Sequence, residues 1–324
     1  MSWIELSLDT NHEAVDWVCT LLAENIDIND IYITEYAESH LANSDWTFTI
    51  RLYLPHDVSA RTGVEKIEHL LSPLHRTGMT TAIQTTVVEN KITDIPQPLV
   101  HRIGQKFIVV TSNTSNKTEI ADKITLRLQK TLAFGSGLHP ATIVSLRLLE
   151  RYITPQMQVL DFGSGSGILS VAMAKLGANV LALDNDSVAV EATQETVSIN
   201  GVEQQVEVIQ GSLGCGSDLG HWMGGNTVDD VSKIEAEDTF DVIVANIFAR
   251  VHIALADDFR RALRQHQAQP GLLITAGFTT DHEESVTTAL TEAGFEVIDC
   301  ERLNEWVALA HQCQLKKPDF PQHI

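Results

Sequence analysis

Apolar and polar residues follow regular periods through the first ninety residues of the chain. Alternation of apolar and polar positions predicts half-buried strands, and apolar residues spaced three to four apart predict amphipathic helices. The order of these patterns is β-α-β-β-α-β, which is typical of the split βαβ or ferredoxin-like α+β fold, a four-stranded sheet with two helices on one side. We therefore assign residues 1–90 to an N-terminal ferredoxin-like domain. Its predicted strands are 3–9, 31–37, 46–54 and 81–88, and its predicted helices are 12–24 and 60–75.

A segment with little periodicity separates this domain from the rest of the chain. Residues 91–98 contain two prolines, which interrupt regular structure, and mark the domain boundary. Two strand patterns follow at 106–112 and 123–129, with a polar turn between them. They predict a hairpin, so residues 91–130 are interpreted as a linker and hairpin that lead into the second domain.

Long apolar strands alternate with helical patterns from residue 131 to residue 324. Strands that are buried on both faces have continuous apolar runs, so this alternation predicts an α/β, Rossmann-like domain whose mainly parallel sheet is covered by helices on both sides. Residues 211–239 interrupt the alternation, because they are rich in Gly, Asp and Ser. We interpret them as a mobile insertion outside the core, with a functional lid as the alternative. The predicted strands are 158–163, 179–186, 205–211, 240–246, 271–277 and 295–301, and the predicted helices are 141–152, 167–176, 187–200, 250–266 and 281–293.

The chain is strongly acidic, and this excludes some classes of partner. Its 324 residues contain 22 Lys and Arg against 43 Asp and Glu, a formal net charge of −21 at pH 7. Such a charge repels nucleic acids and anionic membranes, so we expect no direct nucleic-acid binding and no membrane association, and it attracts a basic partner. The four cysteines lie outside any CxxC pair, which favours reduced thiols over a disulfide framework or a metal site. Without a signal peptide or an apolar run of membrane length, we expect a cytoplasmic protein, and we expect a monomer.

One glycine-rich segment carries the clearest chemistry. In VLDFGSGSGILS a predicted strand ends at Asp161, Gly163, Gly165 and Gly167 follow, and a predicted helix begins. Glycines let the backbone approach a ligand closely, and the unpaired N–H groups of the helix start can bind it. The next strand ends at Asp184, whose carboxylate can accept both hydroxyls of a ribose. These residues predict a nucleoside-cofactor site, and a turn needed only for tight strand-helix packing is the alternative.

The spacing of the glycines separates two classes of cofactor. A dinucleotide fingerprint, Gly-x-Gly-x-x-Gly, needs a glycine where this chain has Ile168, which weakens an assignment to NAD. The segment instead resembles motif I of the S-adenosyl-L-methionine-dependent methyltransferases, Asp-x-Gly-x-Gly-x-Gly. The resemblance implies a class I methyltransferase domain with Asp184 at the ribose of S-adenosylmethionine.

Two further segments narrow the resemblance. Residues 132–142 read LAFGSGLHPAT and stand before the first helix of the α/β domain, and residues 244–249 read VANIFA at the end of its fourth strand. Together with motif I and the start MSWIELSLDT, they resemble the ribosomal protein L11 methyltransferase family, in which an N-terminal ferredoxin-like domain holds the substrate. The resemblance implies a protein N-methyltransferase that acts on lysine or N-terminal amino groups of ribosomal protein L11, its basic protein partner.

The same resemblance implies roles for individual residues, and no metal is among its implications. Asn246 follows an apolar strand, at the edge where open α/β sheets bind ligands, so its amide oxygen is a candidate to aim the acceptor amine; a turn-forming Asn is the alternative. His139 is a second catalytic candidate, and a helix-start or packing histidine is its alternative. The implied cofactor contacts are Thr142, Gly163, Gly165, Gly167, Asp184 and Asn246, with Phe134, Gly135 and Gly137 in the loop that covers the cofactor.

Departures from the family pattern concern the acceptor side rather than the cofactor site. A tryptophan-rich element with Phe-x-Pro is absent between residues 85 and 105, Ser136 and Ala141 stand where Thr is usual, and the segment 211–239 is long. The acceptor therefore stays open: a methyltransferase of the same fold could act on another protein, like the enzyme for the electron-transfer flavoprotein β-subunit, or on a small molecule. A non-catalytic cofactor-binding protein is the alternative from a different class.

Overall fold

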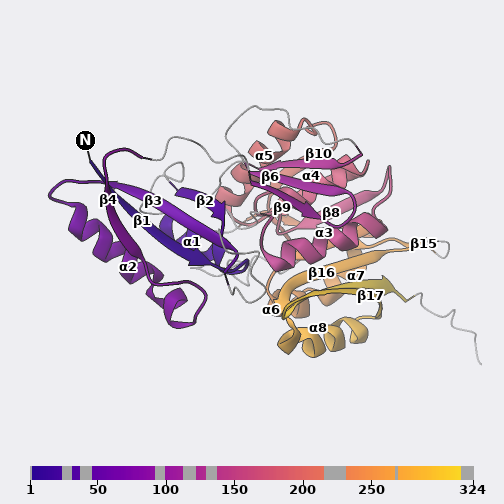
Figure 1. Ribbon diagram of the computed structural model, residues 1–324. Helices are drawn as coiled ribbons and strands as arrows, with labels where there is room; N and C mark the ends of the chain where they lie inside the picture. The colour runs from indigo at the N-terminus through magenta and orange to yellow at the C-terminus, as the bar shows by residue number, and fades with distance from the viewer. Residues whose placement is uncertain are drawn as a thin grey trace, which may run out of the picture.

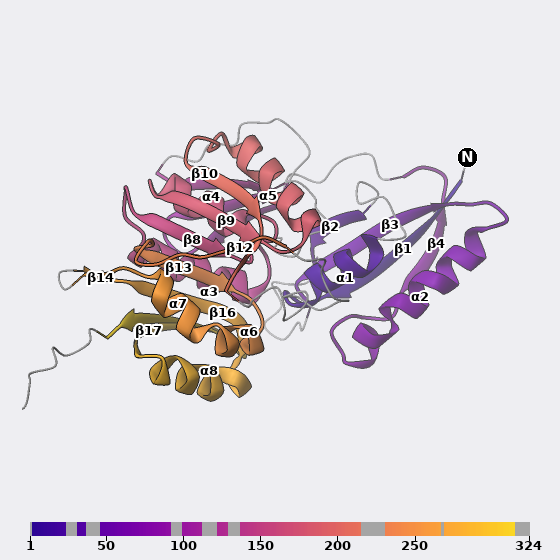
Figure 2. The same ribbon diagram turned by 180° about the vertical axis from the view of Figure 1, so that it is seen from behind.

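Two bodies lie side by side in the computed structural model of the chain (Figure 1). The structure describes residues 2–23, 31–36, 46–91, 99–111, 122–128, 137–214, 231–266 and 269–314. Residues up to 91 form the smaller N-terminal body, and the described residues from 99 onward form the larger C-terminal body, which Figure 2 shows from behind. No helix in these ranges is long and apolar enough to cross a membrane.

The N-terminal body is a four-stranded antiparallel sheet with two helices packed on one face. Its elements are β1 (Trp3–Thr10), α1 (Ala14–Ala23), β2 (Ile31–Glu35), β3 (Phe48–Pro55), α2 (Ala60–Arg76) and β4 (Gln84–Val88). Alternate residues of β1, Ile4, Leu6 and Leu8, are buried in one cluster with both helices, which explains the period of two in the sequence. The strand order is β2-β3-β1-β4, and the element order is the predicted β-α-β-β-α-β.

A three-stranded sheet occupies the place of the predicted hairpin. Its strands are β5 (Leu99–Ile103), β6 (Phe107–Thr111) and β7 (Ile124–Leu128), in that order. β5 and β6 are antiparallel across a short turn at Gly104, whereas β6 and β7 are parallel. The hairpin prediction for 106–112 and 123–129 is therefore wrong, because the twelve residues between β6 and β7 suffice for the crossover that parallel strands need. Phe107 and Leu126 share a hydrophobic core with the C-terminal body.

A seven-stranded sheet with the order β10-β9-β8-β13-β16-β18-β17 forms the centre of the C-terminal body. Its strands are β8 (Gln158–Phe162), β9 (Asn179–Asp184), β10 (Val206–Gln210), β13 (Val242–Asn246), β16 (Leu272–Thr279), β17 (Phe295–Leu303) and β18 (Trp306–Cys313). The five strands from β10 to β16 are parallel. β18 is antiparallel to them, and β17, which is antiparallel to β18, runs in the same direction as the five. All six predicted strands are present, and the predicted α/β class with a mainly parallel sheet is confirmed. β18, which the sequence analysis did not predict, lies between β16 and β17.

Helices cover both faces of this sheet. One face carries α3 (Pro140–Tyr152), α4 (Ile168–Lys175) and α5 (Ser187–Asn200), and the other carries α6 (Ala249–Ala254), α7 (Ala256–Ala262) and α8 (Thr280–Glu292). Successive residues of the central strands, such as Val159 and Leu160, point into opposite cores, which is why β13 and β16 have nearly continuous apolar runs. The single helix predicted over 250–266 is wrong: Leu255, with φ −104° and ψ 12°, leaves helical geometry and separates α6 from α7.

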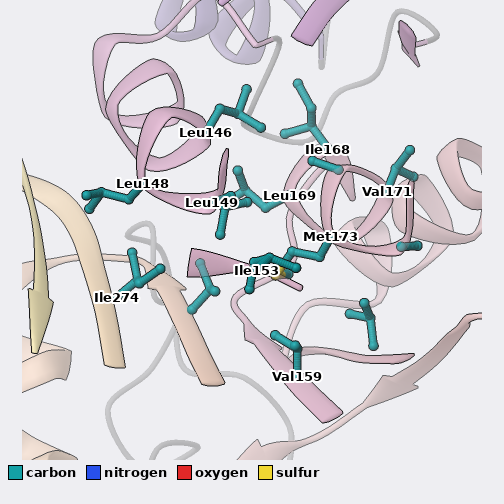
Figure 3. Packing of buried hydrophobic residues seen from close by; sticks show 14 of the residues in the cluster. Leu146, Leu148, Leu149, Ile153, Val159, Ile168, Leu169, Val171, Met173 and Ile274 are labelled. Atoms are coloured by element: carbon teal, nitrogen blue, oxygen red, sulfur yellow. The ribbon is translucent and has the colours of Figure 1, made fainter. Parts of the chain in front are cut away.

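Close packing between α3 and α4 fixes the two helices relative to each other. Figure 3 shows Leu146 and Leu149 of α3 in one buried cluster with Ile168, Leu169 and Met173 of α4. Both helices begin at the edge of the sheet where β8 and β13 end, so this core also holds the loops at that edge in place.

The two ends of the segment 211–239 contain regular structure. β11 (Ser212–Leu213) pairs in parallel with β12 (Lys233–Ile234), and Leu213 is buried in the core beside α7. At these ends the predicted insertion therefore belongs to the packed body, because its few apolar residues face the core. Residues 215–230, the centre of the predicted insertion, lie outside the described residues. A further short pair is β14 (Gln265–His266) and β15 (Gln269–Pro270).

Candidate cofactor and acceptor site

The glycine-rich segment forms a tight turn between β8 and α4. Gly163, Gly165 and Gly167 all have positive φ, at 81°, 54° and 79°, which glycine adopts without strain. The N–H groups of Gly163 and Ser164 donate to the Leu183 carbonyl at 2.8 and 3.2 Å. The turn is thus tied to the end of the neighbouring strand β9, and its backbone can closely approach a ligand beyond the strand ends.

Asp184 closes the turn from the end of β9. Its Oδ2 accepts the Gly165 N–H at 2.9 Å, and its Oδ1 accepts the Asp186 N–H at 3.1 Å. Burial raises the pKa of Asp184 to about 6, although these backbone hydrogen bonds favour the carboxylate. At neutral pH the group is therefore mostly ionised, as an acceptor for ligand hydroxyls must be.

Buried side chains for which the sequence predicts no role stabilise the glycine turn on the side that faces the protein core. Asp161 is completely buried and accepts a hydrogen bond from Ser170 Oγ of α4. Burial raises the pKa of Asp161 to about 7, and the nearby charge of Asp184 acts in the same direction. Thr193 of α5 places its Oγ1 2.9 Å from Ser164 Oγ and 3.0 Å from the Gly165 carbonyl oxygen. The motif contains Asp161, but nothing in the local sequence identifies Ser170 or Thr193 as its neighbours.

The start of α3 lies at the same edge of the sheet. His139 is the N-cap, and its Nδ1 accepts the Ala141 N–H at 3.2 Å. Its buried ring meets Trp306 edge-on with ring centres 4.4 Å apart, and burial, together with His12, lowers its pKa to about 3. The nitrogen that caps the helix does not take up a proton, so this geometry matches the helix-start alternative for His139. Thr142 follows in the first turn of α3, with its Oγ1 buried and without a hydrogen-bond partner among the described residues.

The loop before α3 passes close to two other elements. Gly137 has φ +81°, and an added Cβ would lie 2.8 Å from Ile168 Cδ1 of α4 and 2.9 Å from Val109 Cγ1 of β6. Only glycine fits there without displacing a neighbour. Phe134 and Gly135, the other residues predicted for this loop, lie outside the described residues.

Asn246 is the last residue of β13, the strand beside β8, and therefore ends at the edge that carries the glycine turn. Its Oδ1 is buried and has no hydrogen-bond partner within the described part of the chain. The carbonyl oxygen of the following residue, Ile247, is engaged inside the protein by His252 Nε2 at 3.1 Å. An amide oxygen with this placement is suited to accept a hydrogen bond from a ligand.

Comparison with known proteins identifies the family. The family model described as "Ribosomal protein L11 methyltransferase (PrmA)" matches residues 2–314. The chain belongs to the ribosomal protein L11 methyltransferase family. It is 36% identical over 326 residues to the ribosomal protein L11 methyltransferase of Chloroflexus aurantiacus, covering 96% of this chain and 98% of the relative. The protein of the same name from Herpetosiphon aurantiacus is 34% identical over 325 residues, covering 96% and 99%.

A solved structure from the L11 methyltransferase family has the same fold as this chain. The crystal structure of a ribosomal protein L11 methylase from Lactobacillus delbrueckii subsp. bulgaricus superposes with a TM-score of 0.50 and 25% identity, covering 66% of this chain and 99% of that one. The chain is thus a methyltransferase with a class I, Rossmann-like domain. The family and the fold together imply S-adenosylmethionine as the cofactor.

The residues present in this member of the L11 methyltransferase family fit such a cofactor. At the ends of the strands, the glycine turn presents backbone that no side chain covers. The buried Thr142 Oγ1 and Asn246 Oδ1 are polar atoms that require a hydrogen-bond partner from outside the described residues. The structure brings to this one edge seven of the residues predicted from the sequence, namely Gly137, Thr142, Gly163, Gly165, Gly167, Asp184 and Asn246.

Proposed function

We propose that this protein transfers methyl groups from S-adenosylmethionine to amino groups of ribosomal protein L11, on lysine side chains, on the N-terminal amine or on both. The observation that carries the proposal is the placement of Asn246 Oδ1, which is buried without a partner among the described residues, beside the glycine turn on the neighbouring strand. A hydrogen-bond acceptor at this point can hold an amine N–H while the nitrogen lone pair faces the cofactor. The names of the relatives supply the substrate.

In this proposal the glycine turn and Asp184 hold the cofactor. The backbone at Gly163, Gly165 and Gly167 would lie against the cofactor, the Asp184 carboxylate would accept the ribose hydroxyls, and Thr142 Oγ1 would supply a further hydrogen bond. When bound, S-adenosylmethionine supplies a methyl group on a positively charged sulfur. His139 acts as the cap that fixes the start of α3, and so the position of Thr142, rather than as a proton acceptor.

The acceptor amine has to arrive as a neutral group, because an ammonium has no lone pair. A closed, desolvated site lowers the pKa of an amine and so favours the neutral form. Asn246 Oδ1 then accepts an N–H of the amine and aims its lone pair along the direction of transfer, and such alignment supplies much of the rate of a displacement. The Ile247 carbonyl oxygen already accepts a hydrogen bond from His252 inside the protein. The side chain of Asn246 is therefore the group that accepts the amine N–H.

Incubation with S-adenosylmethionine and purified ribosomal protein L11 tests the proposal by mass spectrometry. We expect mass increases of whole methyl groups on lysine or on the N-terminal amine. Asn246→Leu should lower the transfer rate at least about hundredfold while the enzyme still binds S-adenosylmethionine. Asn179→Leu is the matched control, since Asn179 is exposed at the opposite end of β9, and it should keep full activity.

Absence of methylated L11 with the wild-type enzyme would overturn the substrate assignment. Labelling of a bacterial extract would then reveal another acceptor protein. The net charge of −21 further supports free L11, rather than L11 surrounded by ribosomal RNA, as the substrate. Faster methylation of assembled ribosomes than of the free protein would contradict this part of the proposal.

A further inference from the structure

His252 is a buried histidine that lies six residues after Asn246 in α6. It has no exposed surface, and its Nε2 lies 3.1 Å from the Ile247 carbonyl oxygen and 2.9 Å from the Ala276 carbonyl oxygen. Both partners are acceptors, so Nε2 has to carry the hydrogen. Burial lowers the pKa of His252 to about 4, which keeps the ring neutral at physiological pH. The ring is therefore a neutral donor whose single N–H is shared between two carbonyl groups.

The two carbonyl groups belong to the turn that follows Asn246 and to the strand beside it. Asn246 pairs with Ala276 of β16, and the Ile247 N–H donates to the same Ala276 carbonyl at 3.1 Å. Next to this carbonyl, Gly277 has φ +88°, and an added Cβ would lie 2.6 Å from both the N and the O of Ile247. The register of β16 shifts at this point. The chain after Asn246 is thus pressed against an irregular part of β16, and His252 joins the two.

We propose that His252 is a positioning residue for methyl transfer: by holding the Ile247 and Ala276 carbonyl groups, it fixes the path of the chain after Asn246 and the direction of the Asn246 amide. The inference rests on the proposed function of Asn246. Without the donor, the Ile247 carbonyl is no longer held inward, and the two carbonyl groups lose a hydrogen bond in a buried place. Even a displacement of about 1 Å at an aligned group can lower a rate about hundredfold.

Paired substitutions separate positioning from packing. His252→Gln keeps an amide N–H close to the position of Nε2, whereas His252→Met fills similar space without a donor. We expect His252→Met to lower kcat about ten- to hundredfold with the KM for S-adenosylmethionine changed less than about threefold, and His252→Gln to recover most of the loss. His311→Met is the matched control, because His311 is a similarly buried histidine near His252 whose Nε2 lies 3.0 Å from Thr275 Oγ1 rather than at the Ile247 and Ala276 carbonyl oxygens. It should lose stability but not kcat.

Two measurements decide the inference without relying on turnover. Nitrogen-15 NMR of labelled histidine in the wild-type protein should show His252 as the neutral Nε2–H form at pH 7, and crystal structures should show the Asn246 amide displaced in the Met variant. A protonated or Nδ1–H ring, an unmoved Asn246, equal kcat losses in the Gln and Met variants, or an equal loss in His311→Met would each overturn it. Failure of the wild-type enzyme to methylate L11 would instead overturn the proposed substrate, and the NMR and crystallographic results would still stand.

Discussion

Replacement of Gly167 by alanine tests whether the glycine turn is set by its contact with α5. Gly167 has φ +79°, and an added Cβ would lie 2.9 Å from Thr193 Cα and 3.1 Å from Thr193 Cγ2. A helix backbone cannot move aside as the tip of a flexible side chain can, so the turn itself has to shift. Gly201, at the C-terminal end of α5, is the matched control: its φ is +66°, but nothing lies within 4 Å of an added Cβ.

The two substitutions differ only in the steric contribution. Each places an L-residue in left-handed backbone geometry, which costs about 1–2 kcal/mol. At Gly167 the overpacking adds about 1–3 kcal/mol, so we expect Gly167→Ala to lose about 2–5 kcal/mol of the free energy of unfolding, and Gly201→Ala about 1–2 kcal/mol. The turn of Gly167→Ala can shift to relieve this strain, and S-adenosylmethionine then has to restore the original turn in order to bind. If this restoration costs about 1.4 kcal/mol, the Kd for S-adenosylmethionine rises about tenfold.

Urea unfolding measures the free energies, and isothermal titration calorimetry measures the Kd for S-adenosylmethionine. We expect weakened binding for Gly167→Ala and unchanged binding for Gly201→Ala. Wild-type affinity in Gly167→Ala, or a loss of stability no larger than that of Gly201→Ala, would show that the contact with Thr193 does not set the turn.

Three other outcomes follow, two from the buried residues Asp161 and Leu138 and one from the protonation of the acceptor amine. Burial raises the pKa of Asp161 from its ordinary value of 3.8 to about 7, so the contribution of Asp161 to stability is complete below about pH 4 and is lost as the pH rises through 7. In urea unfolding, Asp161→Asn should therefore be more stable than the wild type at pH 8 but not at pH 4. An equal difference at both pH values would contradict this. Leu138 is buried against Val15 and Phe48 of the N-terminal body. Leu138→Ala should therefore weaken the contact between the two bodies by about 2–5 kcal/mol and separate their unfolding transitions in calorimetry. One sharp transition in this variant would contradict the prediction. The rate of methyl transfer should rise with pH until the acceptor amine is neutral. Replacing the lysine acceptor by an amine of lower pKa should therefore shift the pH–rate profile to lower pH. A profile that does not shift would show that an ionisable group of the enzyme sets the pH dependence instead.

The parts of the fold that follow from local pattern could be predicted from the sequence. Central strands such as β13 and β16 were predictable from their apolar runs, because both faces of these strands are covered. The direction of pairing was not, since the residues of β6 and β7 are equally apolar in a hairpin and in a parallel pair, and only the crossover distinguishes them. The break at Leu255 was hidden for a related reason: its side chain continues the apolar pattern of a helix while its backbone leaves helical geometry.

The candidate site divides in the same way. The turn of Gly163, Gly165 and Gly167 is visible in sequence because three glycines in one short segment are needed for one backbone path, and Asn246 because it ends an apolar strand. The partners of these residues come from distant parts of the chain. Thr193 reaches the turn from α5, and Ala276 meets Ile247 only because β13 and β16 are neighbours in the sheet. Such partners follow from the topology and not from any local spacing.

Neither of the two buried histidines at the site, His139 and His252, can act as a general base. His139 and His252 both have a strongly lowered pKa because they are buried, and each uses a ring nitrogen for a hydrogen bond to the backbone. Neither is therefore suited to remove a proton from an ammonium at neutral pH. A neutral acceptor amine needs no such base, since alignment of its lone pair is what the transfer requires. The buried histidines then serve the reaction best as fixed donors and caps, because a ring that stays neutral holds the same hydrogen bonds across the pH range in which the amine itself titrates.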